Sequence, residues 1–454
     1  MTMYERLLER EAAGRRLGIG LVGAGKFGSM FLAQARRTPG LHVVGVADLA
    51  PARARENLRR TGWPEERIAA HSLGDAADHG TTWVGDDPLA VITHPAVDVV
   101  IDATGHPPAG IAHALGAIAN GKHIIMVTVE ADVLAGPLLA RKASRAGVVY
   151  SLAYGDQPAL IIEQVEWART SGFEVVAAGK GTKYLPEYHR STPDTVWSHY
   201  GINADQARAG GLNPQMFNSF IDGTKSAIEL AAVANATGLL PAPDGLRFPP
   251  CAVEDLAEVL RPAAQGGMLH HKGQVEVVSS VARDGAPVPR SLRWGVYVTF
   301  EAPSDYVARC FAEYGLVADS SGRYAALYRP SHLVGLELGV SVASVGIRGE
   351  PTGAPTAFRG DVVAVAKRNL AAGTVLDGEG GFTVWGRLLP ATESLRLGAL
   401  PIGLAHGVAI REGVAAGAVV RWSDVAVDER ADHVRVRREM ETVVGAGDKS
   451  GGRV

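Results

Sequence analysis

Short apolar runs alternate with helical patterns along the first third of the chain. Residues 17–22 (LGIGLV) and 41–47 are apolar runs bounded by glycine or charged residues, as buried parallel strands are. Between them, apolar residues recur at helical spacing until the chain reaches Thr38-Pro39-Gly40. Residues 1–155 are therefore predicted to form an α/β domain with a doubly wound parallel sheet. Later strand and helix patterns of this domain alternate in the order 97–103, 110–119, 123–127, 137–146 and 148–152.

After residue 155, the strand and helix patterns no longer alternate regularly. They predict helices at 159–170 and 216–237 and strands at 173–179, 274–281 and 292–301. Residues 156–350 are thus expected to form an α+β domain that binds the substrate and supplies a dimerisation surface. A helical pattern at 332–346 is expected to lead the chain back onto the first domain.

A stretch rich in proline, glycine and threonine, residues 349–356, has the composition of a linker. Short strands and turns follow, and they predict a small β-rich third domain over residues 359–428. The charged tail, residues 429–454, ends in glycine-rich sequence and is expected to be disordered.

Composition and charge narrow the possible partners. The 454 residues carry 45 basic and 48 acidic side chains, and no basic block or basic, aromatic stripe occurs, which argues against a nucleic-acid partner. Cys251 and Cys310 lack metal-ligand spacing, so a reduced, cytoplasmic chain is the default. No apolar segment of membrane-spanning length or secretory leader is present, which argues against a membrane partner. We expect a homo-oligomer that acts on a small molecule.

A glycine motif follows the first predicted strand and opens the first helix. In Gly23-Ala-Gly25-Lys26-Phe27-Gly28, the spacing GxGxxG stands in the strand-to-helix context that gives it meaning. Gly23 would allow the tight turn, Gly25 the approach of a pyrophosphate, and Gly28 close packing of helix on strand. The free N–H groups of the helix would bind the anion. The motif predicts a Rossmann domain that binds NAD(P)H.

Asp48 ends the second strand, where a carboxylate would bind the ribose hydroxyls of NAD(H). Arg53 and Arg55 follow it closely, and an arginine there would hold the 2′-phosphate of NADP(H), so both cofactors stay open. Thr104 and Gly105 end a later strand, at the sheet edge where the nicotinamide half is expected. A plain strand-to-helix turn is the alternative for these two residues.

Three stretches resemble the homoserine-dehydrogenase-like oxidoreductases over most of residues 17–350. They are GKHIIMVTVEADVLAG, Ala153-Tyr-Gly-Asp-Gln-Pro-Ala-Leu160 and Gly179-Lys-Gly-Thr-Lys-Tyr-Leu185. The family's catalytic lysine falls on Ala131, flanked by Glu130 and Asp132. An alanine cannot move a proton, so homoserine dehydrogenase activity itself is disfavoured. Lys180 and Lys183 replace the family's asparagine loop with two cations, as a more anionic substrate would require.

The third domain resembles the SAF fold. The segments that carry this likeness are Val363-Ala-Val-Ala-Lys-Arg-Asn-Leu-Ala-Ala-Gly-Thr-Val-Leu376 and Pro401-Ile-Gly-Leu404. A homoserine-dehydrogenase-like body with a SAF tail is similar to the 1-deoxy-D-xylulose 5-phosphate reductoisomerase-like group. That resemblance implies an NADPH-dependent ketol rearrangement and reduction that gives 2-C-methyl-D-erythritol 4-phosphate. Members of one architecture can nevertheless act on different substrates.

The segment 216–229 holds the most reactive-looking side chains outside the glycine motif. On one continuous helix, Asp222, Lys225, Ser226 and Glu229 would share a face. We expect Lys225 to polarise the substrate carbonyl, with Asp222 as its catalytic partner and Glu229 as a substrate contact. The alternative is an Asp222–Lys225 pair that only fixes the helix.

Further residues are assigned to the substrate. Lys180 and Lys183, assisted by Arg190 and Ser191, would hold a phosphate. Two more carboxylates, those of Glu130 and Asp156, are candidate catalytic groups. The remaining possibilities are these: Glu130 with Asp132 as ligands of a divalent metal, Asp132 as a helix cap, Asp156 as an acceptor for a substrate hydroxyl or as a cap, and His332 as a base or an interdomain contact.

These observations favour an NAD(P)-dependent oxidoreductase acting on a small, polyhydroxylated, phosphorylated carbonyl compound, with reductoisomerase activity as the sharpest form. A plain alcohol dehydrogenase of the homoserine-dehydrogenase type is the first alternative. A non-catalytic nucleotide sensor or carbohydrate-binding protein is the second, because Ala131 stands where the family has its lysine. The need for a metal ion stays open.

Overall fold

The computed structural model describes residues 1–209 and 212–445. The chain divides into two compact units. Unit 1 comprises residues 1–160 and 333–356, and unit 2 comprises residues 161–332 with the chain from Ala357 onward. Helix α8 (Gln157–Thr170) begins in unit 1 and ends in unit 2.

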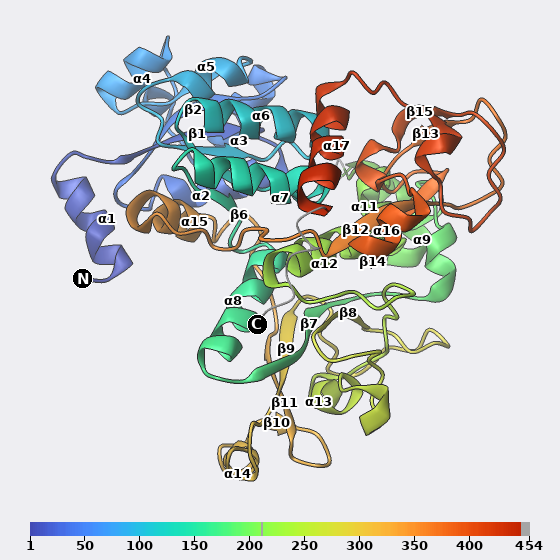
Figure 1. The fold of residues 1–454 in the computed structure, drawn as a ribbon. Helices are drawn as coiled ribbons and strands as arrows, with labels where there is room; N and C mark the ends of the chain where they lie inside the picture. The colour runs from blue at the N-terminus through green and yellow to red at the C-terminus, as the bar shows by residue number, and fades with distance from the viewer. Residues whose placement is uncertain (210–211, 446–454) are drawn as a thin grey trace. The chain divides into compact units, whose positions relative to one another are not determined.

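Unit 1 contains a six-stranded parallel sheet with the strand order β3-β2-β1-β4-β5-β6. Figure 1 labels β1, β2 and β6 of this sheet among the helices of the unit. Crossover helices connect the strands, so the predicted doubly wound α/β fold is confirmed. The strands are β1 (Leu17–Val22), β2 (Leu41–Ala47), β3 (Trp83–Gly85), β4 (Val99–Asp102), β5 (His123–Met126) and β6 (Tyr150–Leu152). The helices of this unit are α1 (Met3–Ala12), α2 (Lys26–Ala35), α3 (Pro51–Arg60), α4 (Leu73–His79), α5 (Pro88–Thr93), α6 (Pro107–Ala119), α7 (Val129–Arg145) and α15 (Gly339–Ala343).

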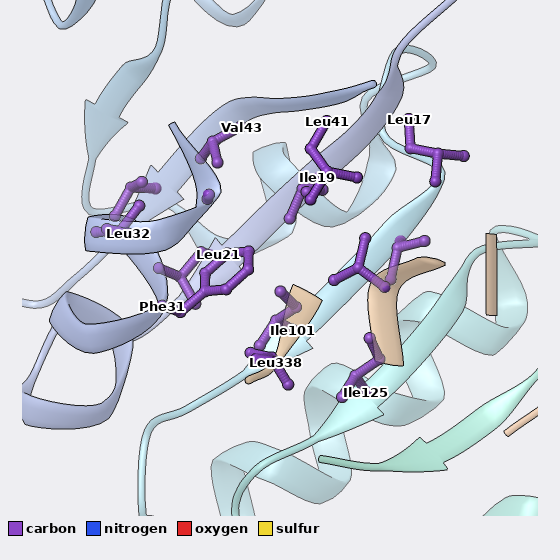
Figure 2. Packing of buried hydrophobic residues seen from close by; sticks show 14 of the residues in the cluster. Leu17, Ile19, Leu21, Phe31, Leu32, Leu41, Val43, Ile101, Ile125 and Leu338 are labelled. Atoms are coloured by element: carbon purple, nitrogen blue, oxygen red, sulfur yellow. The ribbon is translucent and has the colours of Figure 1, made fainter. Parts of the chain in front are cut away.

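The core of unit 1 explains why β1 is apolar along its whole length. All six residues of β1 are buried, because strands β2 and β4 flank it and helices cover the sheet. Figure 2 shows Ile19 and Leu21 of β1 among the side chains of Phe31, Ile101 and Leu338. Leu338 belongs to residues 333–356, so this late segment completes the hydrophobic core of the N-terminal sheet.

Unit 2 contains a five-stranded sheet with the order β10-β11-β9-β7-β8, in which only β7 and β8 are parallel. Its strands are β7 (Glu174–Thr182), β8 (Gln274–Ser279), β9 (Val296–Glu301), β10 (Val317–Ala318) and β11 (Tyr324–Arg329). Its helices are α9 (Val196–Tyr200), α10 (Ala204–Ala209), α11 (Pro214–Ile221), α12 (Thr224–Thr237), α13 (Leu256–Val259) and α14 (Asp305–Glu313).

The single helix expected over residues 216–237 is two helices. Helix α11 ends at Ile221, and α12 begins at Thr224. Gly223 between them has a φ of 89°, a left-handed conformation that glycine adopts without strain. The prediction was wrong at this point because the apolar helical pattern continues on both sides of Gly223, and the pattern alone does not reveal the left-handed turn. Its consequence is that Asp222 does not share a continuous helix with Lys225 and Glu229.

The C-terminal segment is rich in short strands and packs within unit 2. Helix α12 lies against β12 (Gly360–Ala366) and β14 (Val384–Pro390). The Asn235 side chain accepts hydrogen bonds from the backbone of Arg359 and Gly360 at 2.7 and 2.9 Å. The other elements are β13 (Val375–Asp377), α16 (Ala391–Leu397), β15 (His406–Ile410) and β16 (Val425–Ala426).

Residues 432–445, within the tail expected to be disordered, form helix α17 (Asp432–Gly445). Arg437 of this helix is fully buried and donates two hydrogen bonds to Asp361 of β12, at 3.0 and 2.7 Å. The charged composition of the tail concealed an apolar stripe that includes Val434 and Met440, both buried. The expectation of disorder was therefore wrong for residues 432–445, while the part of it that concerns residues 446–454 lies outside the described residues.

Candidate active site

The glycine motif lies in the turn between β1 and α2, and two of its glycines are required by packing. A side chain on Gly23, whose φ is 94°, would place its Cβ 2.6 Å from the carbonyl oxygen of Ala103. A Cβ on Gly28 would lie 2.4 Å from the carbonyl oxygen of Gly23. These distances are far below van der Waals contact, so only glycine fits at either position. This turn therefore has the geometry that the motif predicts.

Gly25 behaves differently, because a Cβ there would have no protein atom within 4 Å. It is the N-cap of α2, and no side chain caps the helix. The first N–H groups of α2 are thus left for an anion, in the position that the pyrophosphate of a dinucleotide takes in Rossmann domains. Lys26 is exposed beside them, whereas Phe27 packs partly against the hydrophobic core. The residues present fit a dinucleotide.

Asp48 is held beside this turn. Its carboxylate accepts hydrogen bonds from the backbone N–H groups of Ala24 and Ala50, both at 2.9 Å. Arg53 lies 3.6 Å from the same carboxylate with a largely exposed side chain. Arg55 instead donates to the carbonyl oxygens of Ile68 and Val84, so its guanidinium serves the fold. Of the two arginines considered for a 2′-phosphate, only Arg53 keeps an exposed head group beside Asp48.

A buried hydrogen-bond network fixes the loop at the end of β4. Asp102 is fully buried and accepts from the hydroxyls of Thr104, at 3.0 Å, and Thr128. His113 Nδ1 lies 2.6 Å from the other carboxylate oxygen, and the N–H of Gly105 donates to Thr128 Oγ1 at 3.0 Å. Thr104 and Gly105 are therefore positioned by side chains that sequence reasoning missed. The only local signal was an aspartate at the end of an otherwise apolar strand.

The first turn of α7 carries Glu130, Ala131 and Asp132. Glu130 is half-buried, and Ala131 is fully buried. Asp132 is also fully buried, lies within the helix rather than at its cap, and accepts a hydrogen bond from the Tyr150 hydroxyl at 2.9 Å. Burial raises the pKa of Asp132 to about 7, against the smaller effect of the Tyr150 hydrogen bond. Asp132 is therefore unsuited to the exposed metal ligation considered from the sequence.

Two predicted substrate residues, Lys180 of β7 and Glu229 of α12, form a buried ion pair with each other. Lys183 is half-buried and donates to the carbonyl oxygen of His199. Burial lowers its pKa, and the charge of Arg293 lowers it further. Each of the two lysines expected to bind a phosphate thus already has a partner within the protein.

Asp222 pairs with a lysine that the sequence did not single out. Lys367, which follows β12, places its ammonium 2.8 Å from the Asp222 carboxylate, and both side chains are almost fully buried. The ammonium also donates to the carbonyl oxygens of Ser191 and Gly381, at 2.8 and 2.7 Å. All three of its N–H groups therefore have acceptors. The carboxylate assigned to catalysis is held in a structural ion pair, and the Asp222–Lys225 pair considered as an alternative is replaced by Asp222–Lys367.

The remaining predicted residues are spread over both units. Lys225 is half-buried in the first turn of α12, and Arg190 is exposed. Ser191 is buried and donates to Asn218 Oδ1 at 2.6 Å, so its hydroxyl serves the fold rather than a phosphate. Asp156 is half-buried just before α8, where its carboxylate accepts from the N–H of Gln157 at 2.9 Å.

The described part of the chain has neither a cluster of metal-ligating side chains nor a helix that could span a membrane. Within residues 1–209 and 212–445, no three or more His, Cys, Asp or Glu side chains are grouped to hold a metal ion. His332 Nδ1 lies 2.7 Å from the carbonyl oxygen of Trp294. None of the described helices combines the length and apolar character that crossing a bilayer requires.

Two family models match successive parts of the chain. Residues 17–127 match "Oxidoreductase family, NAD-binding Rossmann fold", and residues 155–338 match "Oxidoreductase DRL, catalytic domain". Both descriptions are of oxidoreductases, and the first includes the turn and carboxylate described above. They confirm the prediction of an NAD(P)-dependent oxidoreductase. No curated protein matches the chain.

Solved structures resemble parts of the chain. An NAD-binding oxidoreductase from Klebsiella pneumoniae is 23% identical over 38% of this chain and 44% of its own, with a TM-score of 0.27. A homoserine dehydrogenase from Thiobacillus denitrificans is 19% identical over 50% of each chain, with a TM-score of 0.35. A DOX-P reductoisomerase in complex with magnesium is 17% identical over 47% of this chain and 56% of its own, with a TM-score of 0.32. The chain spans less than two thirds of each of these proteins.

Proposed function

We propose that this protein interconverts a carbonyl and an alcohol on a small, polyhydroxylated, phosphorylated compound. The match of residues 17–127 to the model of oxidoreductases with an NAD-binding Rossmann fold supports this proposal. The observation that carries the proposal is the turn at Gly25, where open space, uncapped helix N–H groups and the nearby Asp48 carboxylate suit a dinucleotide. When bound, the dinucleotide supplies or accepts the hydride.

The chain's own residues would bind and orient both reactants. Asp48 would accept the ribose hydroxyls, while Thr104 and Gly105, fixed through Asp102 and Thr128, would contact the nicotinamide half. The rigid network below this loop limits its movement, which favours one orientation of the ring.

Lys225 is assigned to the substrate carbonyl. Its ammonium would stabilise the negative charge that develops on the oxygen during reduction and would supply the proton afterwards. Asp156 and Glu130 are assigned to substrate hydroxyls, as acceptors or proton carriers. Lys183 and Arg190 remain the proposed contacts for a phosphate, because the partner of Lys183 is an uncharged carbonyl oxygen and Arg190 is exposed. Lys180, by contrast, is neutralised by Glu229, and Ser191 donates to Asn218.

The sharpest form of the proposal is a reductoisomerase that acts on 1-deoxy-D-xylulose 5-phosphate. It rests on the resemblance of the whole domain order, since no side chain described above is specific for the rearrangement. Without the rearrangement, the same residues would serve a plain alcohol dehydrogenase.

The test supplies 1-deoxy-D-xylulose 5-phosphate with NADPH or NADH, with and without Mg²⁺ or Mn²⁺, and follows both cofactor absorbance and products by mass spectrometry. Cofactor oxidation with formation of the branched tetrol phosphate supports the reductoisomerase. Cofactor oxidation by other phosphorylated hydroxy-ketones or aldehydes, but not by this compound, supports the plain dehydrogenase. Lys225→Ala should abolish turnover, whereas Lys272→Ala, which removes a lysine paired with Glu301, should leave it unchanged.

A non-catalytic sensor is a second candidate, because the buried Ala131 leaves no proton carrier where the resembled family has its lysine. It predicts dinucleotide binding without cofactor oxidation on any member of a panel of phosphorylated sugars. Turnover that disappears in Lys225→Ala would exclude it.

A further inference from the structure

Unit 2 contains a pocket that none of the assignments above uses. Its volume is about 210 Å³, and four segments distant in sequence line it. His189 comes from the short helix at Pro186–Arg190, Phe248 from the loop between α12 and α13, Ala227 from α12, and Trp385 and Arg387 from β14. The pocket therefore exists only because the C-terminal segment packs against the rest of the unit.

The pocket lies on the side of α12 that faces away from the proposed substrate residues. Successive residues of a helix are rotated by about 100°, so Lys225 and Glu229, each two residues from Ala227, lie about 200° from it, on the other face of α12. Gly223 and Ala227 line the pocket, whereas Glu229 is paired with Lys180. A ligand here would be separate from the substrate of Lys225.

Aromatic rings form one wall of the pocket. The ring of His189 stacks on Trp385 at 3.7 Å between centroids, and Phe248 stacks on Tyr184 at 3.9 Å. Phe248 has a φ of 50°, which is rare for a bulky residue. Its backbone N–H and that of Arg247 donate to the buried Glu276 carboxylate, which holds this conformation in place. Phe248 itself is only 2% exposed, so the accessible ring surface of this wall belongs to the half-buried Trp385 and His189.

His189 contributes ring surface rather than charge. Burial lowers its pKa, so the ring is neutral at pH 7. Its Nδ1 lies 2.7 Å from the carbonyl oxygen of Asp222 and must donate to it, which leaves Nε2 to accept from the Tyr184 hydroxyl at 2.9 Å. Both ring nitrogens are therefore engaged within the protein.

Arg387 provides the charge of the pocket. Its Nε and Nη2 donate to the backbone carbonyl oxygen of Asp244, at 3.2 and 2.7 Å, and this fixes the plane of the guanidinium. In the described part of the chain, its Nη1 makes no hydrogen bond. The carboxylate of Asp244, the only acidic group lining the pocket, belongs to an exposed residue and forms no ion pair there, so water solvates it.

We propose that this pocket is a second ligand site, which binds a small planar anion through stacking on Trp385 and a hydrogen bond from Arg387. The simplest member of this class is an aromatic carboxylate. The rest of the lining consists of three small residues, Gly223, Ala227 and Gly386, and of two leucines, Leu246 and Leu388, beside Asp244.

The test measures binding of benzoate to the full chain by ligand-detected NMR, beside the neutral benzyl alcohol and the cationic benzylamine, which have similar shapes. Benzoate should bind more tightly than either. Arg387→Met should weaken the binding of benzoate at least about 10-fold. Arg396→Met, a surface variant outside the pocket, should leave the affinity for benzoate unchanged. Ala227→Val, which fills the pocket without touching charge, should weaken all three compounds.

Further outcomes would overturn the proposal, and most of them are measured on the parent chain, without any variant. Saturating NADH should leave benzoate bound, because every residue that lines the pocket belongs to unit 2 and the glycine motif belongs to unit 1; competition between the two ligands would overturn the proposal. Equal binding of benzoate by the parent and by folded Arg387→Met, tighter binding of benzylamine, or no binding of any probe to the parent would also overturn it.

Discussion

Removing the ammonium of Lys367 should strongly destabilise unit 2. Lys367→Met keeps the length of the side chain. Within the described residues, it leaves the fully buried Asp222 carboxylate with only the N–H of Thr224 as a partner, at 2.9 Å. The carbonyl oxygen of Gly381 also loses its lysine donor. Breaking a buried ion pair by removing one partner costs about 3–5 kcal/mol. Because a domain is stable by only about 5–15 kcal/mol, this loss is a large part of the total.

The assay is urea unfolding at pH 7, followed by circular dichroism. Arg368→Met is the matched control, because Arg368 is the exposed neighbour of Lys367 and should lose less than about 0.5 kcal/mol. The double variant Lys367→Met with Asp222→Asn removes both charges and should recover about half or more of the loss.

Two results would refute this reasoning. One is a loss below about 1 kcal/mol in Lys367→Met, which would mean that the pair is not buried as described. The other is a double variant that folds stably, binds the dinucleotide and yet has no turnover. That outcome would return Asp222 to the catalytic role predicted from the sequence.

The remaining predictions concern three other positions. The pKa of Asp132 is about 7 in the fold against 3.8 ordinarily, so between these values the folded state keeps a proton that the unfolded chain releases. The resulting contribution to the free energy of unfolding, about 4 kcal/mol, is present below pH 4 and is lost as the pH rises to 7. Asp132→Asn should remove this dependence, and parallel stability profiles of parent and variant between pH 4 and 8 would contradict it. Asp48→Ser should weaken the binding of NADH more than that of NADPH in fluorescence titrations, because the ribose hydroxyls lose their acceptor while Arg53 stays. An unchanged ratio of the two affinities would count against the assignment of Asp48. Arg437→Met should increase hydrogen exchange in α17 and lower the free energy of unfolding by about 3–5 kcal/mol. Substitution of the exposed Arg435 by Met should do neither. Equal protection of α17 in both variants would show that the buried pair of Arg437 with Asp361 does not anchor the helix.

The parts of the fold that sequence reasoning predicted are those specified by short stretches of chain. Strand β1 is apolar at all six positions because it is covered on both faces, and the glycines that follow it are required within a few residues of one another. Local periodicity and spacing therefore predict both features. The break at Gly223 was missed because apolar residues continue at helical spacing on both sides of it.

The candidate site was less predictable because its side chains find partners far away in the chain. Asp222 meets Lys367, 145 residues later, and Lys180 meets Glu229, 49 residues later. No spacing rule relates such residues, since their proximity is created by the packing of α12 against β7 and the C-terminal strands. Residue type alone suggested free charges in a substrate site, whereas burial requires that those charges be paired.

Binding of nicotinamide dinucleotides to the parent and to Gly25→Ala tests the central claim most directly. A methyl group at Gly25 meets no protein atom within 4 Å, so the variant should melt at the parent's temperature. The same methyl group would occupy the approach of the pyrophosphate, so calorimetric titration should show NADH or NADPH binding once per parent chain and at least about 10-fold more weakly to the variant. A parent that binds neither dinucleotide, or a variant that binds as tightly as the parent, would contradict the account.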